Sequence, residues 1–189
     1  MLCAGEQCFY WDLINEDVFT EASPLPYEER RKCCGRGIAT KEGLWVTGGY
    51  NSDAYELEST FYVGLNEVTR GPDLPDPLRS HCVVRINSSR IMIAGGMNDE
   101  HYFDYLSESH YYDEDTKKWS GAQTLSSMRA GHSCSMLTLS GKPYLVVAGG
   151  SSCHSNGMPY SVDTVEFLEM DTDKSSWIEG LAITLFNQS

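Results

Sequence analysis

The sequence predicts an all-β fold, a partial β-propeller made of four-stranded antiparallel blades. Two observations carry this prediction. A Gly-Gly pair closes an apolar run three times, at residues 48–49, 95–96 and 149–150, so the spacings are 47 and 54 residues. The same order of segments recurs around each pair, and such self-similarity is typical of repeat architectures. We expect half a blade followed by three blades.

Residues 1–26 are expected to form the second half of a blade. The stretch "FYWDL" fits the third strand of a unit, "INED" fits its turn, and "VFTEASPLP" fits its fourth strand and exit. The first half of that unit has no counterpart in the sequence.

Repeat 1 is expected over residues 27–77. Its four strands are expected within 29–39 ("ERRKCCGRGIA"), 44–49 ("LWVTGG"), 58–64 ("ESTFYVG") and 66–75 ("NEVTRGPDLP"). The last segment carries a valine where the later repeats carry a tryptophan.

Repeat 2 is expected over residues 78–127. Its strands are expected within 78–86 ("LRSHCVVRI"), 90–97 ("RIMIAGGM"), 108–114 ("ESHYYDE") and 116–121 ("TKKWSG"). Short runs rich in β-branched and aromatic residues, bounded by polar turns, indicate strands.

Repeat 3 and a C-terminal tail are expected over residues 128–189. The strands are expected within 128–137 ("MRAGHSCSML"), 143–151 ("PYLVVAGGS"), 163–170 ("DTVEFLEM") and 174–180 ("KSSWIEG").

The runs before Gly-Gly are apolar at successive positions, which predicts strands buried on both faces. A stack of twisted sheets around an axis provides such burial. The glycines allow the chain to leave the strand at positive φ and let a neighbouring backbone or ring approach where a Cβ would clash. A tryptophan of the outer strand can lie across that gap and anchor the blade.

Taken together, Gly-Gly, the downstream Tyr or Phe, the later Trp and the starts "LRSHC" and "MRAGH" resemble the kelch repeat. The resemblance covers most of the chain, with two departures: Val68 in place of Trp, and Cys33-Cys34 near the His position of the first unit. Kelch propellers usually have six or seven blades, so the resemblance implies a piece of a larger ring. A small four-bladed ring, closed by the C-terminal tail, is the alternative.

The charge of the chain restricts the class of partner. It carries 27 acidic against 14 basic residues, a net charge of −13. Such a chain repels phosphate backbones, so we expect no nucleic-acid partner. No apolar stretch approaches the roughly 18–20 residues of a membrane helix, so we expect no membrane insertion.

Seven cysteines cannot all pair within one chain, and their pairing stays open: Cys3, Cys8, Cys33, Cys34, Cys82, Cys134 and Cys153. Buried thiols are the favoured interpretation, and a disulfide between units is the alternative for a secreted protein. Glycosylation sequons at 87–89 and 187–189 matter only in that second case. A cytoplasmic location is the expectation, and secretion is the alternative.

Three Cys/His pairs are candidate metal ligands: His81 with Cys82, His132 with Cys134, and Cys153 with His154. Neighbouring residues of a strand point to opposite faces, so we expect strand-capping histidines rather than ligands. No G-x-S-x-G context frames a nucleophile, and "YYDEDTKKW" lacks the spacing of a calcium loop. We therefore expect no catalytic residues, no metal site, no cofactor and no enzyme activity.

The loops beside the Gly-Gly pairs are the candidate binding site. The resemblance implies that the loop before each blade's first strand and the loop after Gly-Gly meet on one face. Arginines there suit acidic peptide groups; the alternative is that each arginine pairs with acids of its own blade. If they bind a partner, Arg79→Ala plus Arg129→Ala should leave the melting transition nearly unchanged. The candidate contact residues are Tyr50, Asn51, Arg79, Met97, Asn98, Arg129, Ser151 and Ser152.

The expected function is a non-catalytic protein–protein interaction module that binds a protein or peptide through these loops. The resemblance implies two settings, a substrate adaptor of a cullin ubiquitin ligase or an extracellular binding protein. A galactose-oxidase-like copper enzyme fragment is a further alternative, although no set of Tyr and His ligands maps onto the chain. A purely structural fragment is another. Open blade faces also predict self-association.

Overall fold

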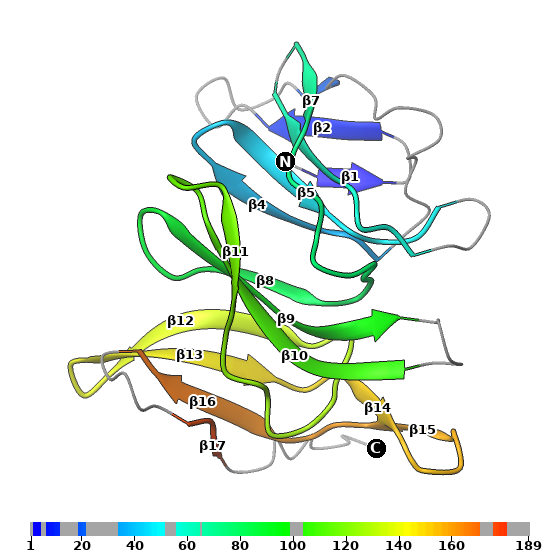
Figure 1. The fold of residues 1–189 in the computed structure, drawn as a ribbon, viewed down its shortest axis with the longest axis vertical. Helices are drawn as coiled ribbons and strands as arrows, with labels where there is room; N and C mark the ends of the chain where they lie inside the picture. The colour runs from blue at the N-terminus through cyan, green and yellow to red at the C-terminus, as the bar shows by residue number, and fades with distance from the viewer. Residues whose placement is uncertain are drawn as a thin grey trace. The chain divides into compact units, whose positions relative to one another are not determined.

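The structure is a computed structural model that describes residues 2–4, 7–11, 19–21, 34–51, 56–64, 66–98, 104–170 and 176–180. Within these residues every regular element is a β strand, arranged in antiparallel sheets (Figure 1). They include no helix that is long and apolar enough to cross a membrane. The chain divides into two units, Met1–Arg79 and Ser80–Ser189.

The first sheet of the N-terminal unit has three strands, β1 (Leu2–Ala4), β2 (Gln7–Trp11) and β3 (Phe19–Glu21), in the order β1-β2-β3. Strand β2 overlaps the predicted third strand at residues 9–11, and β3 lies within the predicted fourth strand; the remaining parts of both predictions, 12–13, 18 and 22–26, lie outside the described residues. Strand β1 was not predicted, so the described part of this half blade has one strand more than expected.

The second sheet of this unit corresponds to repeat 1. Its strands are β4 (Arg36–Thr40), β5 (Gly43–Thr47), β6 (Thr60–Val63) and β7 (Val68–Arg70), paired in sequence order. Each strand lies within a segment predicted for it, apart from a one-residue difference at two boundaries.

Repeat 2 forms the first sheet of the C-terminal unit. Its strands are β8 (Cys82–Arg85), β9 (Arg90–Asn98), β10 (Asp104–Asp113) and β11 (Lys118–Gly121), again paired in sequence order. The register between β9 and β10 shifts between Leu106 and Ser109.

Repeat 3 forms a sheet of β12 (Ser133–Leu139), β13 (Lys142–Ala148), β16 (Val165–Glu169) and β17 (Ile178–Glu179). A separate hairpin, which was not predicted, stands between β13 and β16. It consists of β14 (Ser151–Cys153) and β15 (Pro159–Ser161).

The core of the C-terminal unit lies between its two four-stranded sheets. Met92 and Ala94 of β9 pack in one apolar cluster with Leu145 and Val147 of β13. Strand β9 is buried on both faces, as predicted, from Ile91 to Met97. Strand β13 departs from the prediction, because only alternate residues are fully buried.

The alternation in β13 follows from an open outer side. Every second side chain of these strands points away from the core, and such side chains are only half-buried, as Tyr144 and Phe167 are. Three apolar side chains on this outer side are 42–59% exposed, namely Leu137, Leu139 and Ile178. We call these five residues the outer apolar face of repeat 3.

The two sheets are also linked covalently, because Cys82 of β8 and Cys134 of β12 form a disulfide with a Cα–Cα distance of 6.0 Å. The favoured interpretation of these two cysteines as buried thiols was therefore wrong, and the alternative of a disulfide between units is what the structure contains. Cys34 is disulfide-bonded as well.

The Gly-Gly pairs have the structural role that the sequence predicts. Gly95 has φ +56°, and a Cβ there would lie 2.6 Å from the Arg129 carbonyl oxygen and 2.7 Å from the His132 ring. Gly150 has φ +96°, and a Cβ there would lie 2.6 Å from the Ala130 carbonyl oxygen. Both glycines therefore admit the backbone that leads into repeat 3.

Tryptophans of the outer strands contact other segments of the C-terminal unit, and their predicted placement across the Gly-Gly gap stays a prediction. The Trp119 ring packs 5.0 Å from the Tyr112 ring of its own sheet. Trp177 donates a hydrogen bond from Nε1 to the Gln123 carbonyl oxygen (3.0 Å), so it ties repeat 3 to the segment that follows β11.

Candidate functional site

In the N-terminal unit, the loop after Gly-Gly lies beside the segment that leads into repeat 2. The Gly49 N–H donates to the Leu78 carbonyl oxygen at 2.8 Å. Tyr50 forms an isolated β-bridge with Glu56 on the return of the same loop. The predicted meeting of these two segments is present here.

Arg79 lies where these two segments meet, and its side chain contacts residues of the loop after Gly-Gly. Its Nε donates to Glu56 Oε1 at 2.8 Å, and its guanidinium lies 5.7 Å from the centroid of the Tyr50 ring. The side chains of Arg79 and Glu56 are 17% and 10% exposed. The acid comes from the preceding repeat and not from the arginine's own blade. Tyr50 and Asn51 are half-buried.

In the C-terminal unit, three loop segments meet. The Gly96 N–H donates to the Arg129 carbonyl oxygen (2.8 Å), and Ala130 and Ser151 exchange backbone hydrogen bonds at 2.9 and 2.8 Å. The Ser151 hydroxyl also contacts the Tyr105 hydroxyl at 3.4 Å. The loop after Gly-Gly of repeat 2 and that of repeat 3 therefore share one neighbour, the segment around Arg129.

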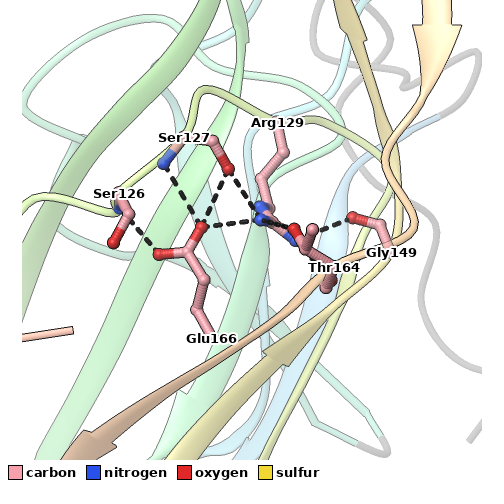
Figure 2. A network of polar contacts seen from close by, with 6 residues as sticks. All are labelled: Ser126, Ser127, Arg129, Gly149, Thr164 and Glu166. Atoms are coloured by element: carbon pink, nitrogen blue, oxygen red, sulfur yellow. Dashed lines mark hydrogen bonds and ion pairs between the residues drawn. The ribbon is translucent and has the colours of Figure 1, made fainter. Parts of the chain in front are cut away.

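Arg129 itself is fully buried and donates hydrogen bonds to groups of its own repeat and to Ser127, the last residue of repeat 2 (Figure 2). Its Nη2 donates to Glu166 Oε1 (2.6 Å), Ser127 Oγ (2.7 Å) and Thr164 Oγ1 (3.0 Å). Its Nη1 donates to the carbonyl oxygens of Gly149 (3.2 Å) and Thr164 (3.1 Å). Arg129 therefore pairs with an acid of its own blade, which was the alternative to binding a partner.

Glu166 completes this network from β16. Its Oε2 accepts the Ser126 N–H at 2.6 Å, and its Oε1 accepts the Ser127 N–H and hydroxyl at 3.2 and 2.9 Å. Arg129 donates five hydrogen bonds through Nη1 and Nη2, and Glu166 accepts three further ones, whereas the buried Arg129 Nε has no hydrogen-bond partner among the described residues. Because the whole Arg129 side chain is buried, it cannot reach a partner, and we remove it from the contact surface.

Sequence reasoning missed Glu166, although a signal was present. An acidic residue in the middle of the apolar strand "DTVEFLEM" occupies the core-facing side, where a carboxylate needs a buried cation. A basic residue at the start of the same repeat was the available partner.

The other predicted contact residues of the C-terminal unit differ in exposure. Met97 and Ser152 are buried, at 7% and 1% exposure, whereas Asn98 and Ser151 are half-buried. The first two contribute to the interior of the loop region and not to its surface.

The β14–β15 hairpin exposes two apolar side chains of the loop region, in addition to Met128 (47% exposed) of the segment that leads into repeat 3. Met158 is 63% and Tyr160 40% exposed. The Tyr160 ring lies 4.5 Å from the exposed ring of His154, at an interplanar angle of 30°. Asn156-Gly157 forms the turn, with Gly157 at φ +79° and Asn156 Oδ1 accepting the Met158 N–H. This dipeptide is a strong local signal for a hairpin.

The part of the chain that the structure describes contains no group of three or more His, Cys, Asp or Glu side chains placed to hold a metal ion. Of the candidate Cys/His pairs, Cys82 and Cys134 are in the disulfide. His81 and His132 are buried beside them.

Comparison with known proteins gives the fold. No family model and no curated protein matches the sequence. A solved structure described as "Structure of YjhT" matches with a TM-score of 0.63 and 16% identity, over 92% of this chain and 52% of that one. The chain thus spans about half the length of this structural relative. Together with the four-stranded antiparallel sheets, the match confirms the predicted fold class, an all-β partial propeller.

Proposed function

We propose that this chain is a non-catalytic interaction module of the kelch type, which binds a protein partner through the loops beside its Gly-Gly pairs. The observation that carries the proposal is the β14–β15 hairpin. It is an addition to the four-stranded sheet and contributes no strand to it. It nevertheless exposes two large apolar side chains, Met158 and Tyr160.

A rigid base supports the hairpin. The Val162 N–H donates to the Gly150 carbonyl oxygen (2.9 Å), and Ser151 is bonded to Ala130 on its other side. Tyrosine supplies a rigid contact surface at low cost in conformational entropy, and tyrosine and methionine side chains are both enriched at protein interfaces. The supported partner is therefore a protein or peptide that presents an apolar group to the hairpin.

The partner's electrostatics differ from the sequence expectation. Arg129 is buried and Arg79 is paired with Glu56, so neither supports recognition of an acidic peptide. The net charge of −13 favours a partner with a basic surface around its apolar contact.

The test compares Met158→Ser/Tyr160→Ser with the wild-type chain and with Leu139→Ser, a control at an exposed apolar residue at the end of β12, in the outer apolar face of repeat 3. Proteins captured from extracts by the three chains are quantified, and any partner found is purified and titrated directly. We expect the double variant to bind at least tenfold more weakly, since two anchors each contribute more than about 1 kcal/mol. Equal binding by all three chains would rule out the hairpin.

A further inference from the structure

The β8–β9 turn carries one of the two sequons, Asn87-Ser88-Ser89. Asn87 and Ser88 are exposed. Asn87 Oδ1 accepts the backbone N–H groups of Ser89 (3.0 Å) and Arg90 (2.8 Å). Both side-chain hydrogen bonds of Asn87 end on its oxygen, so the turn makes no use of the Nδ2 amide nitrogen.

The turn is fixed to the sheet and does not depend on the sequon side chains beyond Asn87. The Glu114 N–H donates to the Ser89 carbonyl oxygen at 2.7 Å. Arg85 donates to Glu114 Oε2 at 2.5 Å and lies 3.4 Å from the carbonyl oxygens of Asn87 and Ser88. A sugar chain on Nδ2 would extend from an exposed turn without displacing a packed group.

The disulfide bonds are an independent observation, and they indicate a compartment in which such a sequon is glycosylated. Strand β8, which leads into the turn, begins with Cys82, and Cys82 is disulfide-bonded to Cys134. The 6.0 Å Cα–Cα distance falls within the range that disulfides require. Cys34 is also disulfide-bonded. Structural disulfides persist in the secretory pathway and outside the cell, and they are rare in the cytosol.

We propose that Asn87 is an N-glycosylation site and that the chain folds in the oxidising lumen of the secretory pathway. In the reaction, Asn87 Nδ2 attacks the anomeric carbon of an oligosaccharide carried on a lipid pyrophosphate. The new C–N bond replaces the C–O bond to the pyrophosphate, which leaves with the electron pair, and Nδ2 loses one proton. No oxidant or reductant is consumed. This proposal replaces the expected cytoplasmic location with the alternative, secretion.

The test uses the full-length transcript that contains this sequence, expressed from its own start in eukaryotic cells. The purified protein is analysed by mass spectrometry before and after treatment with peptide N-glycosidase, which leaves Asp at a formerly glycosylated Asn. We expect a glycan at Asn87 that Asn87→Gln and Ser89→Ala abolish and Ser88→Ala retains. Ser89→Ala keeps the backbone donor to Asn87, so it guards against a folding defect in Asn87→Gln.

Alkylation without reductant is measured on the same samples. We expect Cys82 and Cys134 to remain unmodified until a reductant is added. An Asn87 that carries no glycan in the wild-type chain overturns the proposal, as does a glycan confined to Asn187. Immediate alkylation of both cysteines overturns it as well.

Discussion

Glu166 Oε1 accepts a 2.6 Å hydrogen bond from Arg129 Nη2, and both side chains are at most 1% exposed. The pair therefore lies in the interior of repeat 3, in a position where the sequence suggested a contact residue for a partner. Burial makes the pair a determinant of stability, since removal of either member leaves the other charge desolvated without its counterion.

Arg129→Met should destabilise the protein by about 3–5 kcal/mol, because it leaves the Glu166 carboxylate uncompensated. This reverses the sequence-based expectation that loss of Arg129 leaves the melting transition nearly unchanged. Denaturant unfolding measures the effect. Lys142→Met, which removes an exposed pair with Glu169, is the control and should cost at most about 1 kcal/mol. Equal costs for the two variants would contradict the structural role of Arg129.

Gly95→Ala should cost about 2–4 kcal/mol. The methyl group would meet the Arg129 carbonyl oxygen and the His132 ring, and alanine is strained at φ +56°. Gly121→Ala is the matched control, because a Cβ at Gly121 has no atom within 4 Å. Thermal unfolding of both variants compares them. A Gly95→Ala variant as stable as Gly121→Ala would show that the close approach does not constrain the fold.

Loss of the Cys82–Cys134 disulfide should destabilise the protein by about 4 kcal/mol, the loop-closure entropy for a sequence separation of 52 residues. Cys82→Ala/Cys134→Ala is compared with Cys153→Ala, which alters a cysteine of the β14–β15 hairpin outside the disulfide. Chemical unfolding without reductant gives the difference. If the double variant unfolds at the same denaturant concentration as the control, the bridge is absent or contributes nothing.

The outer apolar face of repeat 3 should promote self-association of this chain. Leu137→Ser/Ile178→Ser removes two exposed side chains from it and should weaken association by about tenfold or more, given roughly 1.5–3 kcal/mol for each buried aliphatic side chain. Sedimentation equilibrium measures the change. The hairpin variant Met158→Ser/Tyr160→Ser should associate like the wild-type chain. A wild-type chain that stays monomeric at high concentration would refute the prediction.

The stability of the β10–β11 turn should depend on pH through the ionisation of Asp113. The pKa of Asp113 is lowered, first by the Thr116 backbone N–H (2.7 Å to Oδ1) and next by the Thr116 hydroxyl (2.9 Å). Because the pKa of Asp113 is lower in the folded than in the unfolded protein, the ionised carboxylate stabilises the fold at pH values above the pKa of the unfolded state. This stabilisation is lost as the pH falls through the pKa of the folded state. Thr116→Ala should raise the Asp113 pKa in an NMR titration. An unchanged value would exclude the hydroxyl as a cause.

The strands of the repeats could be predicted because their signals are local. Apolar runs, Gly-Gly pairs and turn residues sit within a few positions of each other, and the sheet of repeat 2 follows them closely. The Arg129–Glu166 pair could not be placed in this way, since it joins residues 37 positions apart. Its formation depends on which face of β16 turns inward, and that is decided by packing between sheets.

Strand β13 illustrates a second limit. Its sequence is as apolar as that of β9, yet Val146 is half-buried where Ile93 is buried. An apolar sequence indicates that both faces of a strand can be buried. Whether a face is buried depends on what packs against it. The hairpin differs, because Asn156-Gly157 is a local signal for a hairpin turn and the sequence alone is enough to indicate it.

The hairpin has a consequence for engineering and divergence. Its strands bond to each other between Ser151 and Ser161, and the Gly150–Val162 hydrogen bond closes its base. Segments of other length or sequence can therefore replace the tip at residues 154–158 without a change in the pairing of β12, β13, β16 and β17. Residues 154–158 are thus a natural position to graft a foreign peptide epitope, and a position where related chains can acquire new binding specificities while they keep the same scaffold.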